Sequence, residues 1–170
     1  MTSVIAIPKV KNYDMDDLKK SVHAGAEQDY TISNNGFYPN ITLNEVRNAM
    51  RIDGTVTNDR LQTAIIEAIA TINRELRPFQ SAVKNSDVFT LEELESEQIN
   101  GESILVQRYK RGVYCLTVAN LYERYRAYDT TKDGAEKAEE FENSVDDLRR
   151  DARFAIRDIL GKTRVDVELI

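Results

Sequence analysis

A helical hydrophobic period runs through the middle of the chain. Apolar residues recur every three or four positions after Thr57, the spacing of one buried face of an α-helix. They are Leu61, Ile65, Ala68, Ile72 and Leu76. Thr57 is a residue type that caps helix N-termini, so the helix is predicted to begin there. The residue before a proline is disfavoured in the α conformation, and Arg77-Pro78 is therefore predicted to end the helix.

Two shorter helices are predicted from capping boxes, in which a threonine and a glutamate three residues later satisfy the first N–H groups of a helix. Thr42 and Glu45 begin one that continues to about Arg51. Thr90 and Glu93 begin the other, which Gly101 limits to two or three turns. We expect the second to be a short linking helix.

The longest helix is predicted over residues 103–128, and it carries two apolar stripes. One stripe contains Tyr114, Val118, Leu121, Tyr125 and Tyr128, and the other contains Tyr109, Val113 and Leu116. Two stripes indicate that other helices pack on two sides of this one. The tyrosines near its end alternate with arginines, as in some single-strand nucleic-acid sites, but their place on a stripe favours burial of the rings.

The last helix is predicted to end at Gly161, because glycine suits the left-handed conformation that often follows a helix. Its apolar stripe is Phe141, Val145, Leu148, Ala152, Ile156 and Ile159. Glutamates crowd its first half and arginines its second, which complements the helix dipole. One aromatic residue lies opposite the stripe among arginines, as in an interface anchor. The candidate subunit-interface residues are Arg149, Arg150, Arg153, Phe154 and Arg157.

The two ends of the chain differ from its middle. Residues 1–40 show no sustained period and include the loop sequence Ser33-Asn34-Asn35-Gly36, so a flexible or partner-ordered arm is predicted. The last seven residues alternate polar and apolar, which is typical of a strand. They are Arg164, Val165, Asp166, Val167, Glu168, Leu169 and Ile170. No other strand is predicted in the folded part, so this one either frays in the isolated subunit or joins another protein's sheet.

These elements define an all-α fold, a compact bundle of four to five helices with an extended arm and a strand-like tail. The predicted divisions are an arm (1–40), a helical domain (41–161) and a docking tail (162–170). The length of 170 residues suits one domain with its own core. The small numbers of glycines and prolines, 7 and 3, favour helices over many turns.

Charge and cysteine content exclude several classes of protein. The net charge of −6 argues against a general nucleic-acid binder, since such affinity comes from Lys and Arg. Cys115 is the single cysteine and lies in an apolar run, so we expect a buried free thiol and a reducing cytoplasm. The longest nearly apolar run, residues 113–121, is too short to span a bilayer, and no secretory signal is predicted from the N-terminal residues. We expect a soluble protein without membrane contact.

Candidate chemistry is sparse. The single histidine, His23, lies in the predicted arm, so catalytic triads and histidine-containing zinc sites are not expected in the core. Gly161-Lys162-Thr163 resembles the end of a phosphate-binding loop but follows a helix instead of preceding one. Residues 129–140 resemble a calcium-binding EF-hand loop, although Thr131 replaces a carboxylate or amide. We predict no enzyme activity, no cofactor and no metal, and keep a small calcium-binding protein as a minor hypothesis.

Several blocks, in order, are similar to the head completion protein (GpL) family of tailed phages. The most specific are Asn100-Gly101-Glu102-Ser103-Ile104 and Leu121-Tyr122-Glu123-Arg124-Tyr125-Arg126. Others are Phe37-Tyr38-Pro39-Asn40-Ile41, Val46, Met50-Arg51, Val56, Arg60-Leu61, Ile69, Asn73, Glu75 and Leu76. The resemblance covers about residues 37–170, and the arm before Phe37 departs from it.

The resemblance implies a non-enzymatic virion protein that assembles in the host cytoplasm and lies in the neck between head and tail. It would dock on the portal after DNA packaging as a ring of about twelve copies, seal the capsid and offer a platform for the neck or tail terminator protein. Packaged DNA would pass through the ring without specific binding. The tail, residues 164–170, would then add a strand to a portal sheet. The competing hypothesis is a cytoplasmic helical interaction module that forms no ring.

Overall fold

The structure, a computed structural model, describes residues 30–126 and 134–163, with the side chains of residues 125, 126 and 134–143 left out of the description. The described residues form five helices: α2 (Leu43–Met50), α3 (Asn58–Glu75), α4 (Arg77–Lys84), α5 (Ile104–Arg126) and α6 (Gly134–Ile159). The strands are β1 (Thr31–Ile32), β2 (Ile41–Thr42), β3 (Gln98–Ile99) and β4 (Glu102–Ser103). The predicted helical class is confirmed.

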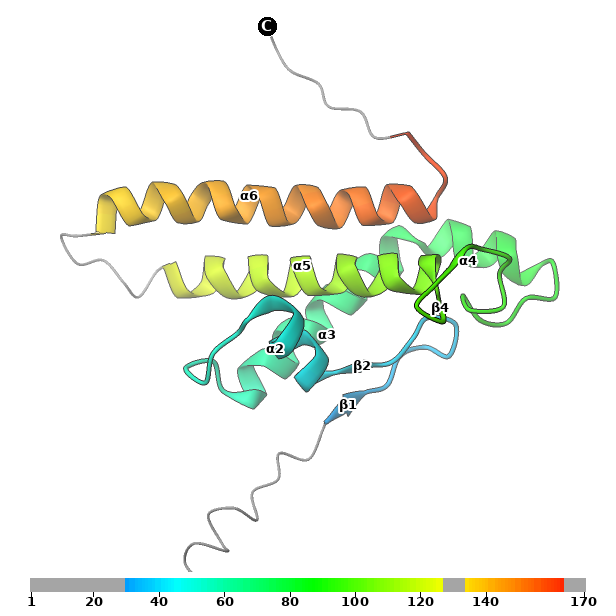
Figure 1. The fold of residues 1–170 in the computed structure, drawn as a ribbon, viewed down its shortest axis with the longest axis horizontal. Helices are drawn as coiled ribbons and strands as arrows, with labels where there is room; N and C mark the ends of the chain where they lie inside the picture. Colours follow the sequence, from blue (N-terminus) through cyan, green and yellow to red (C-terminus); the bar gives the residue numbers. More distant parts are fainter. Residues whose placement is uncertain (1–29, 127–133, 164–170) are drawn as a thin grey trace, which may run out of the picture.

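Helix α5 lies at the centre of the fold (Figure 1). Helix α6 runs antiparallel along one side of it, and α2 and α3 pack against the other. This explains the two apolar stripes of α5: Tyr109 and Val113 are fully buried, and so is Thr117, whose hydroxyl donates to the carbonyl of Val113. The prediction that this helix is packed from two sides is confirmed.

Helix α3 supplies the largest share of the remaining core. All five predicted stripe residues, from Leu61 to Leu76, are completely buried. The N-cap of α3 is Thr57, as predicted, although its side chain forms no capping hydrogen bond. At α2, the Oγ1 of Thr42 does accept from the N–H of Glu45 at 3.2 Å. The Glu45 side chain does not complete the capping box, because it accepts a hydrogen bond from Tyr114 instead.

The chain does not leave the helical conformation for long at Arg77-Pro78. Helix α3 ends at Glu75, as predicted, but α4 begins two residues later with Pro78 in its first turn. A proline there costs no hydrogen bond, because the first N–H groups of a helix have no partner within it. The sequence prediction of a simple stop missed α4.

The linking helix predicted from Thr90 is wrong. The Glu93 carboxylate does accept from the N–H groups of Phe89 and Thr90, at 2.8 and 3.2 Å, but residues 91–94 form a single turn with a bend on each side and no helix. The N–H of Leu91 donates to the carbonyl of Phe37 at 2.8 Å, and the Leu91 side chain is fully buried. This tertiary contact determines the backbone path where the local capping pattern predicted a helix.

Two antiparallel hairpins occur where no strand was predicted. In the first, Ile32 pairs with Ile41, and in the second, Ile99 pairs with Glu102. Asn100 and Gly101 connect β3 and β4 with φ of 55° and 75°, the left-handed geometry that Asn-Gly turns favour. Asn-Gly between two short extended segments is a hairpin signal, so the prediction that Gly101 merely ends a helix was wrong.

Residues 30–40, assigned to the arm from sequence, belong to the folded part of the protein. Ile32, Phe37 and Tyr38 are buried in the main core. The polar run that suggested a loop is indeed a loop, but its flanking apolar residues are anchored. The remainder of the predicted arm, residues 1–29, lies outside the described residues.

Helix α6 ends as predicted. Gly161 has φ of +63°, and the N–H of Lys162 donates to the carbonyl of Arg157 at 2.9 Å. Together with the bond from Gly161 N–H to the Asp158 carbonyl, this is a Schellman cap. Ala152, Ile156 and Ile159 are buried against α5. The predicted strand at residues 164–170 lies outside the described residues.

Candidate interaction surfaces

A partly buried polar cluster joins α5, α3 and the loop before β2. The Tyr109 hydroxyl donates to Oδ1 of Asn73 at 2.7 Å, and Nδ2 of Asn73 donates to Oδ1 of Asn34 at 2.8 Å. Nδ2 of Asn34 donates to the Tyr109 hydroxyl at 2.8 Å, which closes the ring of bonds. The Tyr38 ring stacks on the Tyr109 ring, with centroids 4.6 Å apart. This cluster is structural: it fixes the loop before β2 against α3 and α5.

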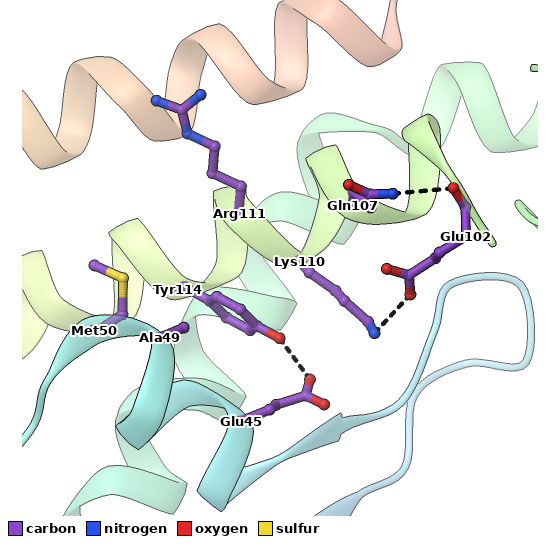
Figure 2. A pocket seen from close by; sticks show the side chains of 8 residues that line it. All are labelled: Glu45, Ala49, Met50, Glu102, Gln107, Lys110, Arg111 and Tyr114. Carbon is purple, nitrogen blue, oxygen red and sulfur yellow. Dashed lines mark hydrogen bonds and ion pairs between the residues drawn. The ribbon is translucent and has the colours of Figure 1, made fainter. Parts of the chain in front are cut away.

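A shallow groove of about 450 Å³ lies between α2 and α5 (Figure 2). Tyr114 donates to Oε1 of Glu45 at 2.7 Å, and Nζ of Lys110 lies 2.7 Å from Oε1 of Glu102. Burial, followed by the hydrogen bond to Glu45 and the charges of Glu45 and Glu102, raises the pKa of Tyr114. Four polar groove residues are thus paired with one another, whereas Arg111, which also lines the groove, pairs with Asp151 of α6. Ala49 and Met50 supply the apolar lining.

The contact between α5 and α6 is close and is flanked by ion pairs. At Gly112, an added Cβ would lie 3.5 Å from Cβ of Ala155 and 3.3 Å from Cδ1 of Ile72, so three helices meet at this residue. Arg111 pairs with Asp151 at 2.9 Å, and Glu123 pairs with Arg149 at 2.5 Å. Further ion pairs include Arg108 with Asp158.

Cys115 is buried in the same contact, as predicted, and is a free thiol. Burial and the nearby Asp151 carboxylate raise its pKa, while Arg111 lowers it. A thiol whose pKa is raised is a poor nucleophile. This residue belongs to the core and offers no site.

The structure divides the predicted subunit-interface residues into two groups. Arg149 is paired with Glu123 on α5, and Nε of Arg157 donates to the carbonyl of Thr163 at 2.9 Å, so both support the fold of their own chain. Arg150 pairs only along its own helix, with Asp147 at 2.8 Å and Asp151 at 4.0 Å, and Arg153 is exposed. Phe154 is half-buried. Arg150 and Arg153 therefore remain the accessible members of the set.

An acidic segment of the surface was missed from sequence. Residues 85–97 contain five acidic side chains and no basic one, and all five are exposed: Asp87, Glu92, Glu93, Glu95 and Glu97. Phe89, in the same segment, is 67% exposed. The run of acidic residues is visible in the sequence, but it was interpreted as part of a linking helix and not as a separate surface.

Other predicted sites are not described by the structure. His23, Tyr128 and the side chain of Tyr125 lie outside the description. Of the segment that resembles an EF-hand loop, residues 129–133 lie outside it too, and residues 134–140 are described only as the helical backbone of α6. Among the residues that are described, no group of three or more His, Cys, Asp or Glu side chains is placed to hold a metal ion. Within the same part of the chain, the helices lack an apolar stretch long enough to cross a membrane.

The described residues from Ile32 onward all fall within one family match. Residues 32–170 match the family described as phage head completion protein (GPL). The chain belongs to this family. The resemblance stated from the sequence blocks is therefore confirmed, and it begins earlier than those blocks, at the buried residue Ile32 of β1.

Two phage proteins with related names are similar to most of the chain. The head completion/stabilization protein of Escherichia phage P2 is 37% identical over 139 residues, covering 82% of each chain. The probable head completion/stabilization protein of Haemophilus phage HP1 is 27% identical over 151 residues, covering 86% of this chain and 98% of that protein. No solved structure shows significant similarity to the chain.

Proposed function

We propose that this head completion protein docks as a ring of about twelve copies on the portal of a DNA-filled capsid, as a structural component of the virion. The ring seals the capsid and provides the platform for the neck or tail terminator protein. The observation that carries this proposal is the family match over residues 32–170, together with the name of the phage P2 relative, a head completion/stabilization protein. The role requires no catalysis.

The tail, residues 164–170, is proposed to bind the portal by adding a strand to one of its sheets. In this mode backbone hydrogen bonds give affinity and alternate side chains give specificity. Val165, Val167 and Leu169 would lie on one face of the added strand, and Asp166, Glu168 and Ile170 on the other. Two facts support this: the sequence alternates, and the Schellman cap at Gly161 stops α6 just before the tail begins.

Packaged DNA is proposed to pass through the ring without specific binding. The net charge of −6 supports this, because strong affinity for a polyphosphate requires a surplus of Lys and Arg. A channel wall dominated by basic side chains in an image of the assembled neck would contradict the idea.

The test mixes purified protein with purified portal rings and measures co-sedimentation. Three chains are compared: the full chain, a chain ending at Lys162, and a full-length chain with Val165, Val167 and Leu169 changed to aspartate. The matched control changes Asp166 and Glu168, on the other side of the strand, to serine. We expect binding by the full chain and the control, and loss of binding by the other two.

The outcomes separate the parts of the proposal. If the full chain does not sediment with portals, the adaptor role is wrong, and the alternative of a helical interaction module that forms no ring is favoured. If the chain ending at Lys162 binds as well as the full chain, strand addition is wrong while the adaptor role stands. If bound copies are isolated instead of forming a closed ring in electron micrographs, the ring is wrong.

A further inference from the structure

We propose that the outer face of α6 binds the acidic segment of a second copy, residues 85–97, and that this contact joins neighbours in the ring. The inference rests on the proposed ring and names the two surfaces that build it. Each copy would present its acidic segment to one neighbour and its α6 face to the other.

The outer face of α6 is an unpartnered helix face within the described structure. Helix α6 packs against α5, and it forms no comparable contact with another described element. Arg150, Arg153 and Arg157 follow one another at spacings of three and four residues, so they lie on one face of the helix. Arg153 is exposed and forms no ion pair with another described residue. The half-buried ring of Phe154 lies beside this stripe.

The acidic segment has the opposite charge and contains no basic side chain. Among the described residues, none of its five carboxylates forms an ion pair, and no Lys or Arg occurs between Lys84 and Arg108. Like charges so close together repel one another, and arginines from another chain would relieve that repulsion. Electrostatic complementarity of this kind fixes the orientation of partners and speeds their association.

The acidic segment also presents an apolar anchor on a fixed backbone. Phe89 is 67% exposed, and Ile99, just after the segment, is 45% exposed. The backbone beside Phe89 is held by the Glu93 carboxylate, and Leu91 is tied to Phe37 and fully buried. Protein interfaces commonly have an aromatic side chain at the centre and polar or charged groups around it.

The two surfaces lie on different sides of the molecule. In Figure 1, α4 and the chain that follows it lie at one end of α5, whereas the outer face of α6 points away from α2 and α3. One copy can therefore contact two neighbours through two different surfaces. Such heterologous contacts close into rings when the rotation between copies is right.

The experiment reverses the charges of the two surfaces, separately and together, and measures how many copies of each variant bind to a portal ring. The first variant carries Arg150→Glu and Arg153→Glu, the second carries Glu92→Arg and Glu95→Arg, and the third carries all four changes. The matched control reverses charges on α3, with Glu67→Arg and Arg74→Glu, both exposed. Native mass spectrometry counts copies per portal, and circular dichroism confirms that each variant is folded.

We expect each of the first two variants to need at least about tenfold more protein to fill the ring, and the combined variant to recover most of the loss. The control should bind as the unchanged protein does. A Phe89→Ser variant should also weaken filling without a change of charge. The inference is wrong if folded single-surface variants fill rings normally, or if the combined variant is no better than they are. Failure of the unchanged protein to form rings would instead contradict the proposed function.

Discussion

Tyr109 of α5 donates a hydrogen bond of 2.7 Å to Asn73 of α3, and this bond is one side of a closed ring of three side chains. Each of Tyr109, Asn73 and Asn34 donates to one member and accepts from another. Tyr109 is fully buried, so its hydroxyl would be costly to leave without a partner. The ring of bonds thus ties the segment before β2 to the two helices that form most of the core.

Replacing Tyr109 by phenylalanine should test the cost of opening this ring. The change removes one hydroxyl and leaves one donor of Asn34 and one acceptor of Asn73 without that partner. We expect a loss of about 1–3 kcal/mol in the free energy of unfolding. Urea unfolding measures it, with Tyr30→Phe as the control, because the Tyr30 side chain is 53% exposed. Equal stability of the two variants would show that the bonds add nothing.

Local sequence patterns predicted the parts of the fold that local physics controls. The five stripe residues of α3 are buried because helical spacing alone places them on one face, and Gly161 ends α6 because it can adopt positive φ. The segment before β2 was missed because its order depends on residues far away in sequence. Asn34 bonds with Asn73 and Tyr109, and no pattern within residues 30–40 contains that information.

Of the two candidate surfaces, the arginine stripe was predicted from the sequence and the acidic segment was not. The arginine stripe of α6 is visible from helical spacing, and so it was predicted. The sequence does not show that Arg149 pairs with Glu123 or that Arg157 donates to the Thr163 carbonyl, because only folding brings these groups together. These two contacts leave Arg150 and Arg153 as the accessible arginines. The acidic segment was overlooked because a local capping pattern predicted a helix, whereas the contact of Leu91 with Phe37 sets another path.

Stability is expected to fall at alkaline pH. Burial raises the pKa of Tyr38, Tyr109 and Tyr114, with neighbouring Tyr109 adding to the effect at Tyr38. Because the folded pKa lies above the unfolded value of about 10, the unfolded chain loses these protons first. The stabilisation is therefore complete below about pH 10 and is lost as pH rises beyond it.

Urea unfolding at pH 9 and pH 11 measures this loss. A Tyr114→Phe variant should lose less stability between the two pH values than the unchanged protein does, because one titrating group is gone. Tyr30→Phe, at a tyrosine that is 53% exposed, is the control for removing a phenol from the surface. A Tyr114→Phe variant with the full alkaline loss would show that its hydroxyl does not contribute.

Because α3, α5 and α6 meet at Gly112, the stability of the fold should depend strongly on the size of the side chain at this position. An alanine adds about 1 kcal/mol of helix propensity. Its Cβ would lie 3.3 Å from the tip of Ile72, which must shift slightly, so we expect a net change below about 1 kcal/mol. A leucine has no room and should cost about 1–3 kcal/mol or more. Thermal unfolding compares these with Ala70→Leu on the exposed side of α3, and a tolerated Gly112→Leu would contradict this packing.

The first two helices offer a matched pair for the energetics of capping. Thr42 and Thr57 both occupy N-cap positions, but only the Thr42 side chain accepts a capping hydrogen bond, from the N–H of Glu45. Thr42→Ala should therefore cost about 1 kcal/mol, and Thr57→Ala less than about 0.5 kcal/mol. Urea unfolding at pH 7 measures both losses. Equal losses would mean that residue type at the cap matters more than the bond, whereas the larger loss at Thr42 would assign the stabilisation to the hydrogen bond itself.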